Sequence, residues 1–230
     1  MDVVAMLSNQ LKEILGAWLQ AIGNIISAIG VTPTDRLSDS AQENLNIVGL
    51  ALQAAGSGLE TEGQSTPFTL EYTGSAIATI GILENLTASL IEFPDETDTT
   101  LNIQGNLLQA VGTTLAALDE FQDITDIGDL ELIIGNLIQT IGSVIQVIGT
   151  KLQYTSSQLS QDDNQQQADS YMQWNQQNGM NSQGQNGNQG QREGQNLIAL
   201  GTWIQAIGAV IAAIGQQKEE MHEMQLGIEE

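Results

Sequence analysis

Apolar residues recur along this chain at spacings of three and four, and within the apolar blocks a glycine recurs every seventh residue. The clearest block, at residues 16–30, reads G-A-W-L-Q-A-I-G-N-I-I-S-A-I-G. Close copies occupy residues 135–149 and 201–215, and weaker copies begin at residues 49, 74 and 105. Because this spacing is typical of α-helices and no period-two alternation occurs, each of the six units is predicted to be a helix.

Six helical units predict an all-α fold, a six-helix and mostly up-down bundle. The three prolines, Pro33, Pro67 and Pro94, lie between units, where helices must end. We divide the chain into five repeat helices over residues 1–153, a flexible Gln/Asn/Gly-rich insertion over 154–194, and a sixth repeat helix with an acidic tail over 195–230. The insertion has too few apolar residues to pack by itself, whereas the sixth helix is expected to join the first five in one domain.

The heptad places different residue types on different sides of each helix when its glycine is counted as position 0. Large apolar residues occupy positions 2, 3 and 6, position 4 is usually Gln, and the remaining positions are small or polar. Small residues allow neighbouring helix backbones to approach closely. Helix packing is therefore assigned to the heptad glycines and to the two tryptophans at position 2: Gly16, Gly23, Gly30, Gly49, Gly56, Gly74, Gly81, Gly105, Gly112, Gly135, Gly142, Gly149, Gly201, Gly208, Gly215, Trp18 and Trp203.

Three uses of the apolar face stay open. An apolar arc this broad needs neighbours on more than one side, so the core of the bundle is the first expectation. Residues 14–31 and 195–215 carry no charge and approach the length of a membrane span, although they contain polar residues and lack positively charged flanks. Surfaces that pair helices within one chain can also pair copies of it. The first and sixth units either pair and close the bundle or face another molecule.

Charge narrows the choice of partners. The chain has five Lys and Arg against 28 Asp and Glu, a net charge of -23. This charge repels phosphate backbones, so no nucleic-acid partner is expected, and it disfavours docking on anionic membranes. The N-terminus lacks the basic region of a secretory signal, which predicts a cytoplasmic location.

Candidate chemistry is sparse. The chain has no cysteine and a single histidine, His222, so no histidine- or cysteine-based catalytic set can be assembled. We expect no enzyme activity and no cofactor. The one candidate metal site is an acidic run in which Asp119, Asp123, Asp126 and Asp129 offer clustered oxygens to Ca²⁺, without the residue order of an EF-hand.

The G-A-W-L-Q-A-I-G wording and its copies at residues 135 and 201 resemble uncharacterised repetitive proteins of spore-forming Gram-positive bacteria, built from G-x-W-Φ-Q-A-I-G units. The resemblance covers the six units but not the insertion, and it implies a bacterial, non-enzymatic helical protein. The predicted function is that of a structural or interaction protein, a helical module that self-associates or binds a protein partner. The alternative is a membrane-active helical protein that binds lipid or forms pores.

Overall fold

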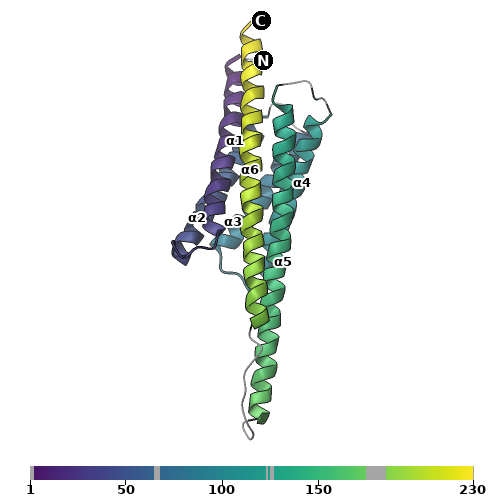
Figure 1. The fold of residues 1–230 in the computed structure, drawn as a ribbon. Coiled ribbons are helices and arrows are strands. Elements are labelled where there is room, and N and C mark those ends of the chain that lie inside the picture. Colours follow the sequence, from purple (N-terminus) through teal and green to yellow (C-terminus); the bar gives the residue numbers. More distant parts are fainter. Residues whose placement is uncertain (1–2, 65–67, 123, 125–126, 175–184, 230) are drawn as a thin grey trace.

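The computed structural model describes residues 3–64, 68–122, 124, 127–174 and 185–229. Within these residues the chain forms six helices and no strand, which confirms the predicted all-α fold (Figure 1). The helices are α1 (Val3–Val31), α2 (Asp39–Gly63), α3 (Leu70–Leu90), α4 (Asp95–Glu120), α5 (Asp129–Trp174) and α6 (Gln185–Glu229).

Local sequence signals account for several helix starts. The side chains of Ser38 and Thr69 accept hydrogen bonds from backbone N–H groups in the first turns of α2 and α3. Each side chain satisfies a donor that has no partner within its helix. Pro94 precedes α4, whose first turn carries Asp95, Glu96 and Asp98, and these negative charges favour the positive end of the helix dipole.

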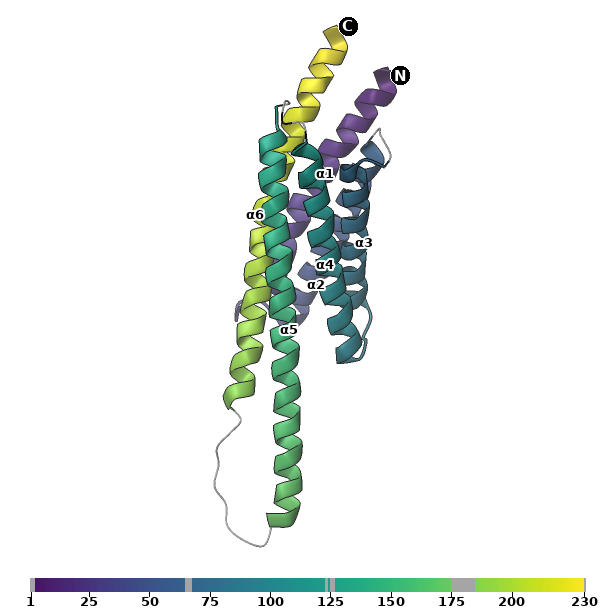
Figure 2. The same cartoon turned by 90° about the vertical axis from the view of Figure 1, so that its right-hand side faces the viewer.

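The six helices form a closed ring. In the described part of the chain, the backbone of each helix lies next to those of the helices before and after it, and α1 lies next to α6. Among these described helices, no backbone approaches one across the ring, which only side chains span. The N- and C-termini lie at the same end of the molecule, while α5 and α6 project past the other helices at the opposite end (Figures 1 and 2). The first and sixth units thus lie side by side and close the ring.

The region of the predicted flexible insertion, residues 154–194, is organised differently from the expectation. Helix α5 continues to Trp174 and α6 begins at Gln185, so only residues 175–184 of the insertion lie outside the described residues. The hairpin contact also continues, because Gly190 lies against the side chain of Ser156. Gln, Ala and Ser are compatible with helix, and α6 lies beside α5 as far as Ser156. The last turns of α5 extend past the end of α6 (Figure 2).

The large apolar side chains point outward, which contradicts the expectation that they form the core. Each helix has a position-6 residue that is 46% to 55% exposed: Ile22, Val48, Ile80, Val111, Ile141 and Ile207. In contrast, the position-4 glutamines Gln53, Gln109, Gln139 and Gln205 are only 3% to 8% exposed. The ring buries the small and amide-bearing side of each helix because that side permits the closest approach of backbones and can form hydrogen bonds.

Candidate functional site: a polar interior within an apolar belt

Glycines hold the helices together in three antiparallel hairpins, α1–α2, α3–α4 and α5–α6. A Cβ atom on Gly16 would lie 2.6 Å from the carbonyl oxygen of Gly56, and one on Gly142 would lie 2.6 Å from that of Gly201. Contacts this short admit no side chain, so the two backbones touch directly at these positions. The other facing pairs are Gly23 with Gly49, Gly74 with Gly112, Gly81 with Gly105, Gly135 with Gly208, Gly149 with Gly194 and Gly215 with Gly128, while Gly30 faces the backbone of Asn46.

Two glycines of these pairs were not among the predicted packing residues. Gly128 and Gly194 each lie seven residues before a unit that the sequence pattern identified, at Gly135 and Gly201. Extending the seven-residue spacing by one step would have found both. Gly128 also has a positive φ of 125°, a conformation that side chains disfavour, at the start of α5.

The contacts between hairpins use small side chains and hydroxyl groups in place of glycine. At the α1–α6 contact, Ala17, Ala21, Ala209 and Ala213 form a buried cluster, against which Trp18 packs. At the α2–α3 contact the hydroxyl oxygens of Ser57 and Thr79 lie 2.7 Å apart, and at the α4–α5 contact those of Thr113 and Thr140 lie 2.8 Å apart.

The two predicted packing tryptophans stabilise the closure of the ring from opposite sides. Trp18 Nε1 on α1 donates a hydrogen bond of 2.9 Å to Gln217 Oε1 in the C-terminal half of α6. Trp203 Nε1 on α6 donates one of 2.9 Å to Thr32 Oγ1, just beyond α1. Because each tryptophan reaches the other helix, the pair fixes the antiparallel register of α1 and α6.

The interior of the ring contains two polar cavities, one beyond the other along the helices. The larger, of about 320 Å³, lies toward the end at which α5 and α6 project and is lined by amides, hydroxyls, Asp95 and Asp98. The smaller, of about 40 Å³, lies toward the chain termini and is lined by Gln20, Glu60, Glu71 and other residues. All six helices contribute to both cavities, and their size and polarity suit water.

A hydrogen-bonded cluster centred on Gln205 separates the two cavities. Gln205 Nε2 donates to Ser143 Oγ at 2.6 Å and to Gln109 Oε1 at 3.2 Å, while Gln205 Oε1 accepts from Gln146 Nε2 at 2.5 Å. All of these side chains are buried. Gln205 therefore joins α4, α5 and α6 and blocks the middle of the interior.

Carboxylates gather at the end of the ring that carries the termini. Burial, followed by the neighbouring charge of Glu71, raises the pKa of Glu60 to about 8 against the opposing effect of a hydrogen bond from Gln20. Burial also raises the pKa of Glu71 to about 7, with a contribution from Asp119. Among the described residues, the two lysines with ion pairs do not contact these carboxylates: Lys12 pairs with Glu62 and Lys218 with Glu131.

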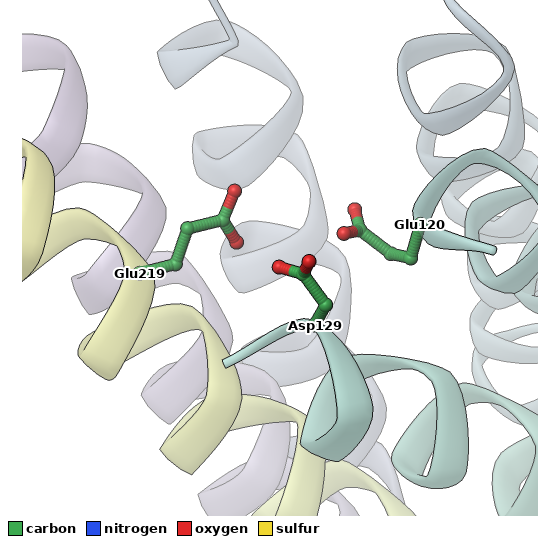
Figure 3. A group of neighbouring side chains, drawn as sticks. All are labelled: Glu120, Asp129 and Glu219. Carbon is green, nitrogen blue, oxygen red and sulfur yellow. The ribbon is translucent and has the colours of Figure 1, made fainter. Parts of the chain in front are cut away.

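The predicted calcium residues divide into three groups. Asp119 accepts the backbone N–H of Glu71 at 2.9 Å and so caps the start of α3. Asp123 and Asp126 lie outside the described residues. Asp129 lies instead with Glu120 and Glu219 (Figure 3). One carboxylate oxygen from each of the three residues lies within 4.8 Å of the other two. Glu219 could not be found from the sequence, because it reaches this cluster only through the pairing of α5 with α6.

An apolar belt surrounds the polar interior. We define it by the charge-free segments 14–31, 44–59, 99–118, 132–150 and 194–217, together with residues 72–90 of α3. These segments are about 24–36 Å long, close to the hydrocarbon thickness of a bilayer. Helix α3 differs because it carries Glu84, whose Oε2 is buried without a hydrogen-bond partner.

Three of the helices are long and apolar enough to cross a membrane. The segments are Leu7–Val31 in α1, Asp129–Ser160 in α5 and Gln189–Leu226 in α6. They include the two helices that close the ring. The membrane alternative of the sequence analysis thus has a structural basis in length and composition.

The fold and the interior together define a class: an all-α ring of three glycine-paired hairpins, with a polar interior and an apolar exterior. The chain belongs to a family of unknown function, DUF6944, whose family model matches residues 11–183. The matched region runs from α1 to the end of α5 and stops before α6. No curated protein and no solved structure matches the chain.

Proposed function

We propose that this protein is a non-enzymatic membrane protein, in which the apolar belt contacts lipid chains and the ring encloses a polar interior. One observation carries the proposal: large apolar side chains are exposed on all six helices while glutamines are buried between them. In water this distribution is unfavourable, because each Leu or Ile side chain left exposed forgoes about 1.5–3 kcal/mol of burial.

Lipid removes that disadvantage. Within a bilayer, helices associate through close packing of small residues and through hydrogen bonds, which are the contacts that hold this ring together. Ionisable groups in membrane proteins lie at the ends of helices or face the interior of the bundle. In this chain Glu60 and Glu71 flank the belt and line the interior.

The charge of the protein specifies the kind of lipid surface. Its net charge is -23, with five Lys and Arg in the whole chain. An anionic leaflet would repel such a protein, whereas a zwitterionic one would not. We therefore expect insertion into phosphatidylcholine vesicles that weakens as anionic lipid is added.

Flotation of the purified protein with phosphatidylcholine vesicles, followed by an alkaline carbonate wash, tests the proposal. The wild-type protein should float and resist extraction. The double variant Ile141→Glu/Ile207→Glu places two charges on the belt and should lose this resistance. Ile124→Glu changes an equally exposed residue outside the belt and serves as the matched control.

Self-association is the second candidate, because the belt could equally be covered by further copies of the chain. The outward face of α5 favours it, with an apolar residue every three or four positions: Leu130, Ile134, Leu137, Ile141, Val144 and Ile148. Light scattering of the detergent-free protein separates the two candidates. Discrete oligomers that fail to float would overturn the membrane proposal and support assembly.

A further inference from the structure

The charged residue types that line the two cavities of the interior are all acidic. Among the described residues that line the two cavities, none is Lys, Arg or His. Glu60, Glu71 and Glu120 line the smaller cavity, and Asp95 and Asp98 line the larger. The two cavities therefore favour positive charge over anions. The basic side chain of Arg192 lies nearby, since it lines a further pocket of about 480 Å³ that shares Gln153 and Gln191 with the larger cavity.

Between these carboxylates, the cavity walls offer oxygen atoms of the kind that replace the hydration shell of a cation. The larger cavity is lined by the side chains of Gln53, Asn85 and Asn106, with hydroxyls among them. Asn85 is buried, and its Oδ1 has no hydrogen-bond partner. Amide oxygens and carboxylates are the ligand types found in cation pathways.

A small movement would connect the two cavities. On α6, Thr202 lines the larger cavity and Ala209 lines the smaller, and Gln205 lies between them. On α5, the residue that contacts Gln205 is Ser143, which is fully buried and accepts a hydrogen bond from it. Rotation of the Gln205 side chain away from Ser143 would remove the atoms that separate the cavities, without any change in the glycine contacts.

We propose that the interior of the ring is a cation pathway, closed at the Gln205 cluster and made selective by the carboxylates that line both cavities. This inference rests on the proposed membrane function, since a pathway has a role only where the ring crosses a bilayer. The permeant species is a small cation such as K⁺, coordinated by water and by amide oxygens. Anions are excluded by Asp95 and Asp98, and by Glu60 and Glu71 once the pH exceeds their raised pKa values of about 8 and about 7.

The test measures ion flux in phosphatidylcholine vesicles containing the full chain, with a K⁺ gradient and a voltage-sensitive dye. Gln205→Ala should raise K⁺ flux several-fold over the wild type, because it shortens the side chain that separates the cavities. Gln104→Ala removes an exposed glutamine from the outer side of α4 and should leave the flux at the wild-type level. Chloride flux should stay low in all three proteins.

The selectivity for K⁺ over Cl⁻ provides a second measurement, which does not depend on the Gln205 cluster. In the Gln205→Ala background, Asp98→Asn should reduce the ratio of K⁺ to Cl⁻ permeability. Glu60→Gln should do so at a pH above about 8, where the Glu60 carboxyl is ionised. Gln205→Ala protein that floats with vesicles yet conducts no K⁺, or conducts K⁺ and Cl⁻ equally, would overturn the pathway and leave the membrane proposal intact. Absence of flotation would instead overturn the membrane proposal itself.

Discussion

Two glycines in similar helical surroundings illustrate what the heptad glycine contributes. A Cβ on Gly142 would lie 2.6 Å from the carbonyl oxygen of Gly201 and 2.7 Å from the backbone nitrogen of Gln205. A Cβ on Gly58 would meet nothing within 4 Å. Each glycine disfavours helix by about 1 kcal/mol relative to alanine, so only at the first position does a close contact offset that disadvantage.

We expect Gly142→Ala to destabilise the fold by about 1–3 kcal/mol, because the added methyl group forces α5 and α6 apart. Gly58→Ala should stabilise it by about 0.5–1 kcal/mol through helix propensity alone. Chemical unfolding in mild detergent, followed by circular dichroism, measures both. Equal effects of the two substitutions would show that the glycine contact contributes nothing.

Buried carboxyl groups predict a dependence of stability on pH. The pKa values of Glu60 and Glu71, about 8 and about 7, lie above the value of 4.5 for an unperturbed glutamic acid. Protons are therefore bound on folding, and the stabilisation is present below pH 4.5 and is lost as the pH rises through these raised values. The Tm should fall between about pH 5 and about pH 9.

The variant Glu60→Gln tests which group is responsible. Glutamine retains an oxygen that accepts the hydrogen bond of Gln20 but does not ionise. The variant should therefore lose less stability than the wild type over the same pH range. An unchanged pH dependence would rule out Glu60 as its source.

At the scale of elements, two kinds of helix contact alternate around the ring. Within each hairpin, facing glycines bring the two backbones together. Between hairpins, small alanines and hydroxyl-bearing side chains form the contacts. The hairpin contacts are local in sequence, whereas the α1–α6 contact joins residues about 200 positions apart, as in the bond of Trp18 to Gln217. Closure of the ring thus depends on its smallest buried side chains.

Enlarging one of these side chains should weaken closure. Ala213 on α6 is 0% exposed within the alanine cluster of the α1–α6 contact. Ala213→Leu should destabilise the protein by about 1–3 kcal/mol by overpacking. Ala55→Leu adds the same atoms to an exposed alanine of α2 and should change stability little. Thermal unfolding of both variants in detergent gives the comparison, and equal Tm values would contradict a tightly packed closure.

At the scale of the whole molecule, the protein inverts the usual distribution of polarity. Trp203 lies in the belt on α6 with 39% of its surface exposed. If the belt contacts lipid chains, this indole should report it directly. We expect its fluorescence to shift to shorter wavelength on addition of phosphatidylcholine vesicles and to be quenched by lipids brominated on their acyl chains.

The measurement uses Trp18→Phe/Trp174→Phe protein, in which Trp203 is the only tryptophan left. The converse protein, which keeps only Trp18, provides a comparison from a tryptophan packed against the alanine cluster. Quenching should be stronger for Trp203. Emission of Trp203 that is the same in buffer and in vesicles would contradict lipid contact.

Sequence reasoning anticipated the elements but not their orientation. The six helices and the role of small residues in close packing both follow from local spacing around Gly16, Gly135 and Gly201. The direction in which the apolar face points does not follow from this spacing, because the same helical pattern fits a face in the core or a face on the exterior. The cluster of Glu120, Asp129 and Glu219 was equally hidden, because its members come from three helices.

The sequence by itself determined the helices, their number and the side of each helix that admits close contact. These properties depend on side-chain size and on the spacing of residues within a few helical turns, and both can be read from the sequence. Only the tertiary structure decided that the small, amide-bearing sides meet around a polar interior and that Ile22, Ile141 and Ile207 face outward. The physical reason is that helix contacts form where backbones come closest, at glycine, and the heptad places the large side chains on the opposite side.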